Sequence, residues 1–285
     1  ERDPEHMYTE YWRLKEKPFE NTLDMRFAFM TPQHKEGLAR LLYTVEERKC
    51  GAILTGDYGT GKSFLRQAFL GKLSRIGSFV VASVDNPLGG IEAVLTDIYC
   101  QIVEKPAAFT SFGAALREMR EALLARNARG FHSLVLIEES QLIPDIQMLE
   151  QLRLMMDLQD GEGRPLISVL FFGHLDLLRV LGQCRALSQR IPNRWTLEPL
   201  SVAQTRDYIT HRLSIAGGNG WIFDDDAVLA IHEHTGGLVR LVNNIGDLSL
   251  YLGMSEEVVR VDASIVNRIV KDWELSQPLK VEGSP

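Results

Sequence analysis

One eight-residue stretch, GDYGTGKS at residues 56–63, limits the possible folds of this chain more than any other feature. It matches the pattern G-x-x-x-x-G-K-[ST] at every defined position. The apolar run 52–54 precedes it and a helical pattern follows, which is the strand–loop–helix context in which this pattern is used. Glycines let such a loop turn its backbone N–H groups inward toward phosphate oxygens, and the helix start adds its positive dipole end.

Individual residues of this loop are predicted to hold a nucleoside triphosphate and its metal ion. Lys62 can reach the β- and γ-phosphates, and the Ser63 hydroxyl can ligate Mg²⁺. Asp57 and Tyr58 are variable positions of the pattern and are assigned no chemistry. The residues predicted to contact the nucleotide from the loop and helix start are Gly56, Gly59, Thr60, Gly61, Lys62, Ser63 and Phe64.

Strand-like and helical patterns alternate over the first 200 residues. Strands are predicted at 51–55, 79–84, 133–137 and 166–172, and helices at 31–48, 62–75, 88–103, 112–127 and 146–158. Such alternation favours a parallel sheet with helices on both faces. Beyond residue 201 only helices are predicted, at 202–216, 225–235, 239–252 and 263–275, with glycines between them. The expected fold class is therefore α/β, a P-loop parallel-sheet core with a C-terminal all-helical domain.

The predicted organisation has four parts with different charge. They are a lead-in segment and helix packing on the core at 1–48, the P-loop core at 49–200, a helical lid at 201–275 and a disordered tail at 276–285. Their net charges are 8 − 10 = −2 for the first, 16 − 16 = 0 for the core and 6 − 11 = −5 for the lid. The overall charge of −7 excludes a uniformly basic nucleic-acid coat, although a local basic patch remains compatible with it.

Two further features concern the cellular compartment. No run of about 18 apolar residues occurs, so no transmembrane helix is predicted within the chain. The three widely spaced cysteines argue against a disulfide framework and favour a reducing compartment.

A second candidate site element follows the apolar run 134–137, which ends in Glu138 and Glu139. Two acids at the end of a buried strand are typical of a Walker B element. The first would hold Mg²⁺ and the second, Glu139, would act as the general base toward the attacking water. P-loop metal sites normally use Asp at the first position, so the extra methylene of Glu138 can either hold the metal or crowd it.

Taken together, these motifs resemble the AAA+ ATPases, and more narrowly the ExeA/GspA-type ATPases of bacterial secretion and pilus systems. The resemblance runs from about residue 7 to residue 271. Its segments are 7–8, 14–19, 26–29, 34–38, 149–154, 187–191, 197–200, 208–213, 216–217 and 236–243. It implies that the nucleotide is ATP with Mg²⁺, that the chain hydrolyses it, and that copies of the chain oligomerise with nucleotide.

The resemblance also implies roles for residues outside the loop. Arg240 corresponds to the sensor 2 arginine of the lid, and His174 stands where the family usually has a glutamine as sensor 1. Arg190 is the candidate arginine finger, with Arg185 and Arg194 as alternatives. Phe19 either lies against adenine or packs in the core. The predicted catalytic residues are thus Lys62, Glu139, His174 and Arg190.

The expected function is an ATPase that remodels or assembles a protein partner in an envelope or secretion system. Its expected location is the cytoplasm, either as a separate protein or as the cytoplasmic part of a longer membrane-anchored one. A first alternative is a DNA-associated regulator of the transposition-helper type, which needs basic residues clustered on one face. A second is a nucleotide-dependent scaffold that hydrolyses slowly or not at all, for which Glu138 and His174 are the reasons.

Overall fold

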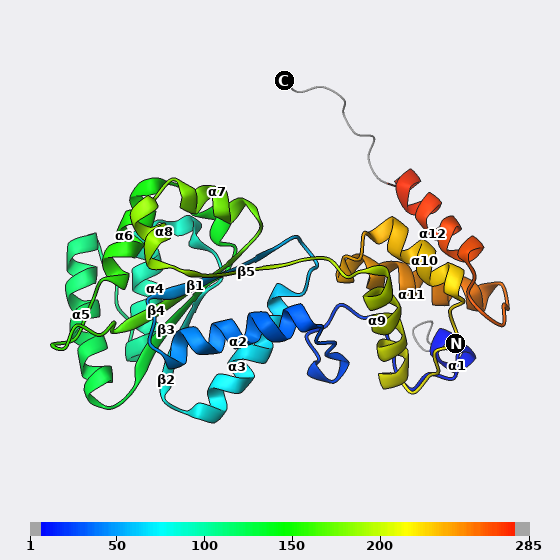
Figure 1. Cartoon of the computed structure of the whole chain (residues 1–285), viewed down its shortest axis with the longest axis horizontal. Coiled ribbons are helices and arrows are strands. Elements are labelled where there is room, and N and C mark those ends of the chain that lie inside the picture. Colours follow the sequence, from blue (N-terminus) through cyan, green and yellow to red (C-terminus); the bar gives the residue numbers. More distant parts are fainter. Residues whose placement is uncertain (1–6, 277–285) are drawn as a thin grey trace, which may run out of the picture. The chain divides into compact units, whose positions relative to one another are not determined.

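The computed structural model describes residues 7–276, and Figure 1 shows the path of the chain. The predicted tail therefore lies outside the described residues, apart from Ser276. The chain divides into two compact units. The first contains the described parts of 1–31 and 199–285 together with residues 58–60, and the second contains 32–57 and 61–198.

The second unit is built on a five-stranded parallel sheet with the order β2-β3-β4-β1-β5. The strands are β1 (Gly51–Gly56), β2 (Phe79–Val84), β3 (His132–Ile137), β4 (Ile167–Gly173) and β5 (Asn193–Leu197). In the register of the sheet, Thr55 pairs with Gly173 on one side and with Thr196 on the other. Because all the strands run in one direction, their carboxyl ends meet at one edge. The 56–63 loop, Glu138, Glu139 and His174 directly follow strands at that edge.

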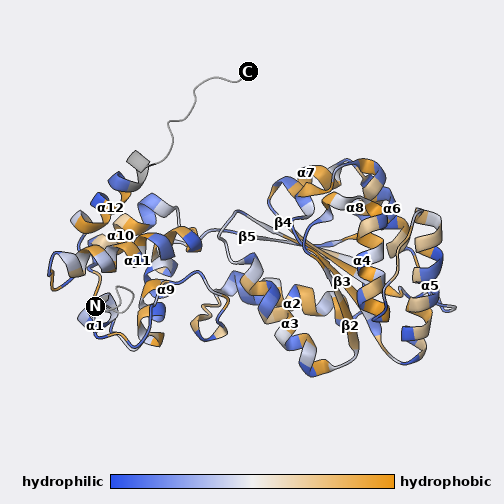
Figure 2. Ribbon diagram, turned by 180° about the vertical axis from the view of Figure 1, so that it is seen from behind, coloured by the Kyte–Doolittle hydropathy of each residue, from blue (hydrophilic) through white to orange (hydrophobic). Residues whose placement is uncertain are grey.

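The three central strands are buried along their whole length, as apolar neighbours on both faces require. Figure 2 shows β3 and β4 mostly in hydrophobic colours. The edge strand β5 was not predicted. Its residues alternate between more and less exposed positions, and it has polar residues at Asn193, Arg194 and Thr196, so it lacks the continuous apolar run of its neighbours.

Helices cover both faces of this sheet. One face packs against α4, α5, α6, α7 and α8 through strand residues such as Ile53, Val135 and Phe171. The intervening residues, such as Leu54 and Leu136, point to the opposite face because side chains alternate along a strand. Helices α2 and α3 pack there. The bounds are α2 (Pro32–Glu46), α3 (Lys62–Ile76), α4 (Ile91–Val103), α5 (Phe112–Ala128), α6 (Ile146–Met156), α7 (Asp176–Gly182) and α8 (Arg185–Arg190).

The first unit is helical. Its helices are α1 (Met7–Tyr11), α9 (Val202–Ile215), α10 (Asp225–Thr235), α11 (Val239–Ser255) and α12 (Ala263–Ser276). The N-terminal segment contributes buried aromatic side chains to its core. Trp12 donates a hydrogen bond from Nε1 to the Leu250 carbonyl at 2.8 Å, and Phe19 is 2% exposed.

The predicted lead-in segment 1–48 is therefore divided between the two units. Its described residues up to Thr31 group with the C-terminal helices, and only α2 packs on the sheet. Buried Arg212 explains part of this arrangement. It donates hydrogen bonds to the carbonyls of Pro18 and Glu20, while its guanidinium lies 4.5 Å from the centre of the Phe27 ring.

The predicted start of one helix was three residues early. Instead of beginning at Leu88, α4 begins at Ile91 after a short 3-10 turn over Pro87–Gly89. Gly90 has φ +79° and ψ 171°, a conformation that interrupts the helix and that glycine adopts without a steric penalty.

Candidate nucleotide-binding site

The loop between β1 and α3 has the backbone conformation that its glycines allow. Gly59 and Gly61 both have positive φ, +85° and +96°. A methyl group at Gly61 would lie 2.9 Å from Nε2 of His34 on α2, so this position is closed to larger residues on steric grounds also. Gly61 is the N-cap of α3 and has no side chain that could cap the helix. The N–H groups of the first turn are therefore not bonded to an N-cap side chain, as an anion site requires.

Lys62 lies over its own loop. Its Nζ donates hydrogen bonds to the carbonyl oxygens of Gly56 at 2.8 Å and Asp57 at 2.9 Å. Phosphate oxygens would replace these neutral acceptors with charged ones, which form stronger hydrogen bonds with an ammonium group. Of the neighbouring predicted contacts, Thr60 is buried, Ser63 is exposed and Phe64 is partly buried.

His174 follows β4 and lies beside this loop. Its Nε2 is 3.4 Å from the Oδ1 of Asp57, and its Nδ1 is 3.0 Å from the Oδ2 of Asp176. The structure thus brings the predicted sensor histidine to the phosphate loop. It also gives Asp57 a partner that the sequence pattern did not reveal.

Glu138, at the end of β3, faces an arginine from the helix that follows the loop. The Nε of Arg66 lies 2.6 Å from the Oε1 of Glu138, and Arg66 also donates to the Ser83 hydroxyl at 3.2 Å. The N–H of Arg66 Nε is not directed at the carboxylate, so neither atom has a hydrogen-bond partner among the described residues. Burial raises the pKa of Glu138, and the positive charge of Arg66 partly offsets this effect.

The chemistry of this position fits a divalent cation. A carboxylate oxygen that accepts no hydrogen bond is a ligand of the kind that Mg²⁺ binds, and Mg²⁺ would have to displace the Arg66 guanidinium from the Oε1 of Glu138. Arg66 was missed in the sequence, although the signal was present. It lies four residues after Lys62 in α3, and residues four apart in a helix share a face.

Glu139 is exposed and is held at the sheet edge by Gln141. Its backbone is left-handed, with φ +45°. The Nε2 of Gln141 donates to the Oε2 of Glu139 at 2.6 Å, and the Oε1 of Gln141 accepts from the His174 backbone N–H at 2.9 Å. Gln141 therefore links the predicted general base to the end of the neighbouring strand, a contact that sequence reasoning missed.

The three candidate finger arginines differ in their surroundings. Arg190, on α8, forms an ion pair with Asp157 at 2.6 Å. Arg194 donates to the Ser188 carbonyl and hydroxyl at 2.5 and 2.6 Å, so its guanidinium caps α8. Arg185 is exposed at the start of α8 and forms no ion pair with any described residue.

The remaining predicted residues, Arg240 and Phe19, lie in the helical unit. Arg240 is exposed in the first turn of α11. Phe19 packs edge-on against Phe223, with ring centres 5.9 Å apart, and closely against Gly246. Since only 2% of Phe19 is exposed, its ring offers no face to a base, and of the two alternatives the structure supports core packing.

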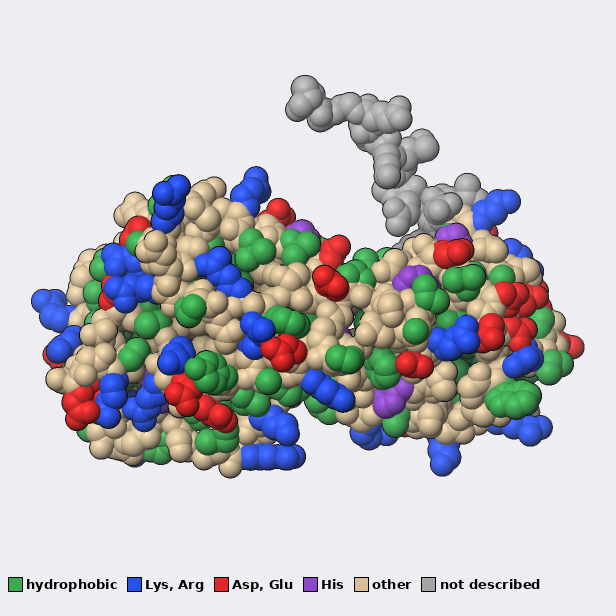
Figure 3. All heavy atoms as spheres, in the orientation of Figure 1, with side chains coloured by type: hydrophobic (Ala, Val, Ile, Leu, Met, Phe, Trp, Pro, Cys, Tyr) green, Lys and Arg blue, Asp and Glu red, His purple; other side chains and the backbone are tan. Residues whose placement is uncertain are grey.

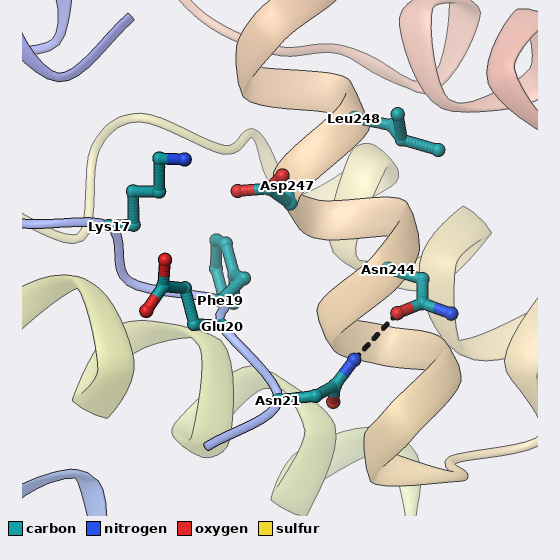
Figure 4. Close-up of a pocket in the computed structure, with 7 residues that line it drawn as sticks. All are labelled: Lys17, Phe19, Glu20, Asn21, Asn244, Asp247 and Leu248. Carbon is teal, nitrogen blue, oxygen red and sulfur yellow. Dashed lines mark hydrogen bonds between the residues drawn. The ribbon is translucent and has the colours of Figure 1, made fainter. Parts of the chain in front are cut away.

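Beside Phe19 the surface has an open hollow of about 420 Å³ with a mixed polar lining (Figure 4). The segment that follows α1 and one side of α11 form its walls, and Asn21 donates to Asn244 at 2.7 Å across it. Its lining residues are Lys17, Phe19, Glu20, Asn21, Asn244, Asp247 and Leu248. Asp247 accepts a hydrogen bond from the hydroxyl of Tyr8, so the hollow is also fixed to α1.

Comparison with known structures shows a similar fold in several solved proteins. Drosophila ORC, in a structure bound to DNA, is 15% identical with a TM-score of 0.70, covering 96% of this chain and 66% of that one. Aeropyrum pernix ORC1, in complex with DNA, is 18% identical with a TM-score of 0.63, covering 89% and 70%. Domain III of Thermotoga maritima DnaA is 14% identical with a TM-score of 0.57, covering 90% and 98%. At these identities the likeness concerns the fold alone.

Sequence comparison gives a nearer relationship. Residues 44–181 match the model of the AAA domain. General secretion pathway protein A of Aeromonas hydrophila is 34% identical over an alignment of 266 residues that covers 91% of this chain and 48% of that protein. The chain thus spans about half the length of this relative, and none of its described helices is long and apolar enough to cross a bilayer. Residues 44–181 are thus similar to an AAA domain, and most of the chain is similar to General secretion pathway protein A, which confirms the resemblance inferred from its motifs.

Proposed function

We propose that the chain binds MgATP at the 56–63 loop and hydrolyses it. One observation carries this proposal. The loop with its two left-handed glycines lies at the same sheet edge as the acids that end β3 and the histidine that follows β4. Phosphoryl transfer needs mainly positioning and charge stabilisation. This edge supplies hydrogen-bond donors for phosphate oxygens, a candidate metal ligand and a candidate base together.

Each residue has a distinct part in the proposed reaction. Lys62 binds the β- and γ-phosphates, and His174 hydrogen-bonds the γ-phosphate or the attacking water. Glu139 accepts a proton from that water while the water oxygen bonds to the γ-phosphorus. The bond between the γ-phosphorus and the oxygen that bridges it to the β-phosphate breaks, which releases ADP and phosphate. Ser63 and Glu138 would hold Mg²⁺, which, when bound, neutralises phosphate charge.

We further propose that the helical unit acts as a lid and that the chain oligomerises with nucleotide. Arg240 would contact the γ-phosphate from the lid, and an arginine of the α8 region would act in a neighbouring subunit. Arg190 keeps this proposed role, since its side chain is 39% exposed and the ion pair with Asp157 can be exchanged for a contact in a neighbouring subunit. Because Arg185 forms no ion pair with residues 7–276, it is the first alternative to test.

The partner we propose is a protein of a secretion assembly, reached from the cytoplasmic side. The nearer relative is named for the general secretion pathway. On the face that Figure 3 shows, Lys and Arg side chains lie among acidic and apolar ones and form no continuous stripe, which is compatible with a protein partner.

A slow nucleotide-dependent scaffold is the second candidate function. The specific observation for it is the ion pair between Arg66 and Glu138, because the arginine occupies the carboxylate that would otherwise bind the metal ion. Slow turnover would follow if ATP and Mg²⁺ do not displace this arginine. The two candidates share the ATP site and differ in the rate of hydrolysis.

Calorimetry with MgATP tests the proposed site directly. We expect the wild-type chain to bind and Lys62→Ala to bind at least tenfold more weakly, a difference of about 1.4 kcal/mol. Lys72→Ala is the matched control, since Lys72 is an exposed lysine further along the same helix. Equal affinity of wild type and Lys62→Ala, or no binding to either, would refute the proposal.

Two further measurements separate the finer proposals. Phosphate release at concentrations that permit assembly distinguishes an active ATPase from the slow scaffold. Mass measurement with and without a non-hydrolysable ATP analogue tests oligomerisation, and a salt-dependent gel shift with duplex DNA tests the alternative partner.

A further inference from the structure

Gln141 connects two elements of the candidate site that are distant in sequence. It lies in the short 3-10 turn Ser140–Leu142 that follows β3, two residues after Glu139 and 33 before His174. Its side-chain amide uses both ends: Nε2 donates to the Glu139 carboxylate at 2.6 Å, and Oε1 accepts from the His174 backbone at 2.9 Å.

The orientation of this amide is determined by its partners. A backbone N–H can only donate, so the atom of Gln141 that faces His174 must be the oxygen. The NH₂ group is then left to face Glu139, where a carboxylate accepts it as a charge-assisted hydrogen bond. A glutamate at this position would present oxygen to the carboxylate, and a methionine would offer it no donor.

The end of β4 leaves room for this arrangement. A methyl group at Gly173 would lie 2.7 Å from the Oε1 of Gln141, closer than atoms of this kind approach. Gly173 has no positive φ, so its small size, and not its backbone freedom, is what the contact requires.

The turn that carries Glu139 is held on its other side as well. The Ser140 hydroxyl donates to the Ile137 carbonyl at 2.7 Å, and the Leu142 N–H donates to the Glu139 carbonyl at 2.8 Å. The backbone of Glu139 is therefore fixed in its left-handed conformation, and what remains to be fixed is the direction of its side chain. Among the described residues, Gln141 is the side chain that hydrogen-bonds it.

We infer that Gln141 is a positioning residue for Glu139, and this inference rests on the proposed ATPase function. It holds the carboxylate at a set place relative to the main chain of His174. The proposed base and the proposed phosphate sensor are thereby coupled through one amide, so that a shift of the β4 end on nucleotide binding is transmitted to the base. Gln141 itself need not touch the nucleotide.

Substitution of Gln141 tests this role. In Gln141→Glu and Gln141→Met we expect kcat to fall about 10- to 100-fold, because a base displaced by about 1 Å loses that much rate. The KM and the calorimetric Kd for MgATP should stay within about twofold, since no phosphate contact is removed. Gln183→Met is the matched control, because Gln183 is exposed and its side chain makes no hydrogen bond to a described residue; its kcat should equal that of the wild type.

A double-mutant cycle distinguishes a role of Gln141 through Glu139 from a general effect of the substitution on the fold. If Gln141 acts through Glu139, then Gln141→Met should have less than a twofold effect on the single-turnover rate in a Glu139→Gln background. An equal loss in both backgrounds would show that Gln141 acts elsewhere and would overturn the inference. Gly173→Ala, which displaces the amide without removing it, should give the same selective fall in kcat if Gln141→Met is too unstable to measure.

Failure of the inference is distinguishable from failure of the proposed function. If the wild-type chain neither binds nor hydrolyses MgATP, the proposed function fails first, and the inference falls with it. If the wild type hydrolyses ATP and the Gln141 variants keep kcat within twofold, the inference alone is wrong.

Discussion

Two adjacent glycines between α10 and α11 allow a controlled test of how the helical unit is held together. Gly236 and Gly237 both have positive φ, +58° and +77°. They differ in their surroundings: a methyl group at Gly236 meets nothing within 4 Å, whereas one at Gly237 would lie 2.0 Å from the Leu200 carbonyl oxygen. The Leu200 N–H also donates to the Gly237 carbonyl at 3.0 Å, so the two segments lie side by side.

These differences set the expected losses of stability. Gly236→Ala should cost about 1–2 kcal/mol, the left-handed penalty of a residue with a Cβ. Gly237→Ala pays the same penalty and adds roughly 1–3 kcal/mol for the overlap with the Leu200 backbone. Moving that backbone away also weakens its hydrogen bond to Gly237, at about 1 kcal/mol. We therefore expect Gly237→Ala to lose roughly 2–4 kcal/mol more than Gly236→Ala.

Urea unfolding followed by circular dichroism measures both variants. At this chain length 1 kcal/mol corresponds to about 2–4 °C in Tm, so thermal unfolding should separate the two variants by at least about 4 °C. The helical unit should account for the change. Equal destabilisation of the two variants would refute the reasoning, because it would mean that the Leu200 contact does not restrict position 237.

Three further predictions follow from single positions. Gly71→Ala, at an exposed site inside α3 with open space around it, should raise the free energy of unfolding by about 0.5–1 kcal/mol, and an unchanged urea midpoint would contradict this. Burial, with a smaller contribution from Arg48, lowers the pKa of His132 to about 4. The unfolded chain therefore binds a proton below pH 6.5 that the folded chain does not, so stability should fall by about 2 kcal/mol from pH 7 to pH 5, and His132→Gln should remove that part of the pH dependence in parallel urea titrations. Glu138→Asp should lengthen the ion pair with Arg66 and destabilise the chain by up to about 1 kcal/mol in the absence of nucleotide, with a smaller difference when MgATP is added to the same unfolding assay.

The features that were predicted best from the sequence are those that adjacent residues determine. The loop at 56–63 and the strand β1 before it were identified because adjacent residues carry both the apolar run and the glycines. The helix predicted at 31–48 was likewise found from local signals, as α2 over Pro32–Glu46. Such features need no information from distant parts of the chain.

Contacts between distant residues explain what was not predicted. The strand β5 exists because it pairs with β1, more than 130 residues earlier, and its own residues carry little strand signal. The lead-in segment was assigned to the core, but Trp12 and Phe19 pack with residues beyond 200 in the helical unit. The same holds for the pair of Arg66 and Glu138 and for the bridge made by Gln141, since each joins residues that only the sheet brings together.

The pairing of Arg66 with Glu138 changes how the departure from aspartate at the end of β3 is understood. From sequence, the longer acid was a possible handicap for a metal site. In the structure its extra methylene brings the carboxylate to 2.6 Å from an arginine on α3, four residues beyond Lys62. An aspartate is one bond shorter, so the same contact would require the strand or the helix to move. The length of the Glu138 side chain therefore matches the position of Arg66. Any metal ion that binds Glu138 must compete with the Arg66 guanidinium. The identity of the acid thus bears on how readily the nucleotide-free site accepts Mg²⁺, independently of the base Glu139, which has its own partner in Gln141.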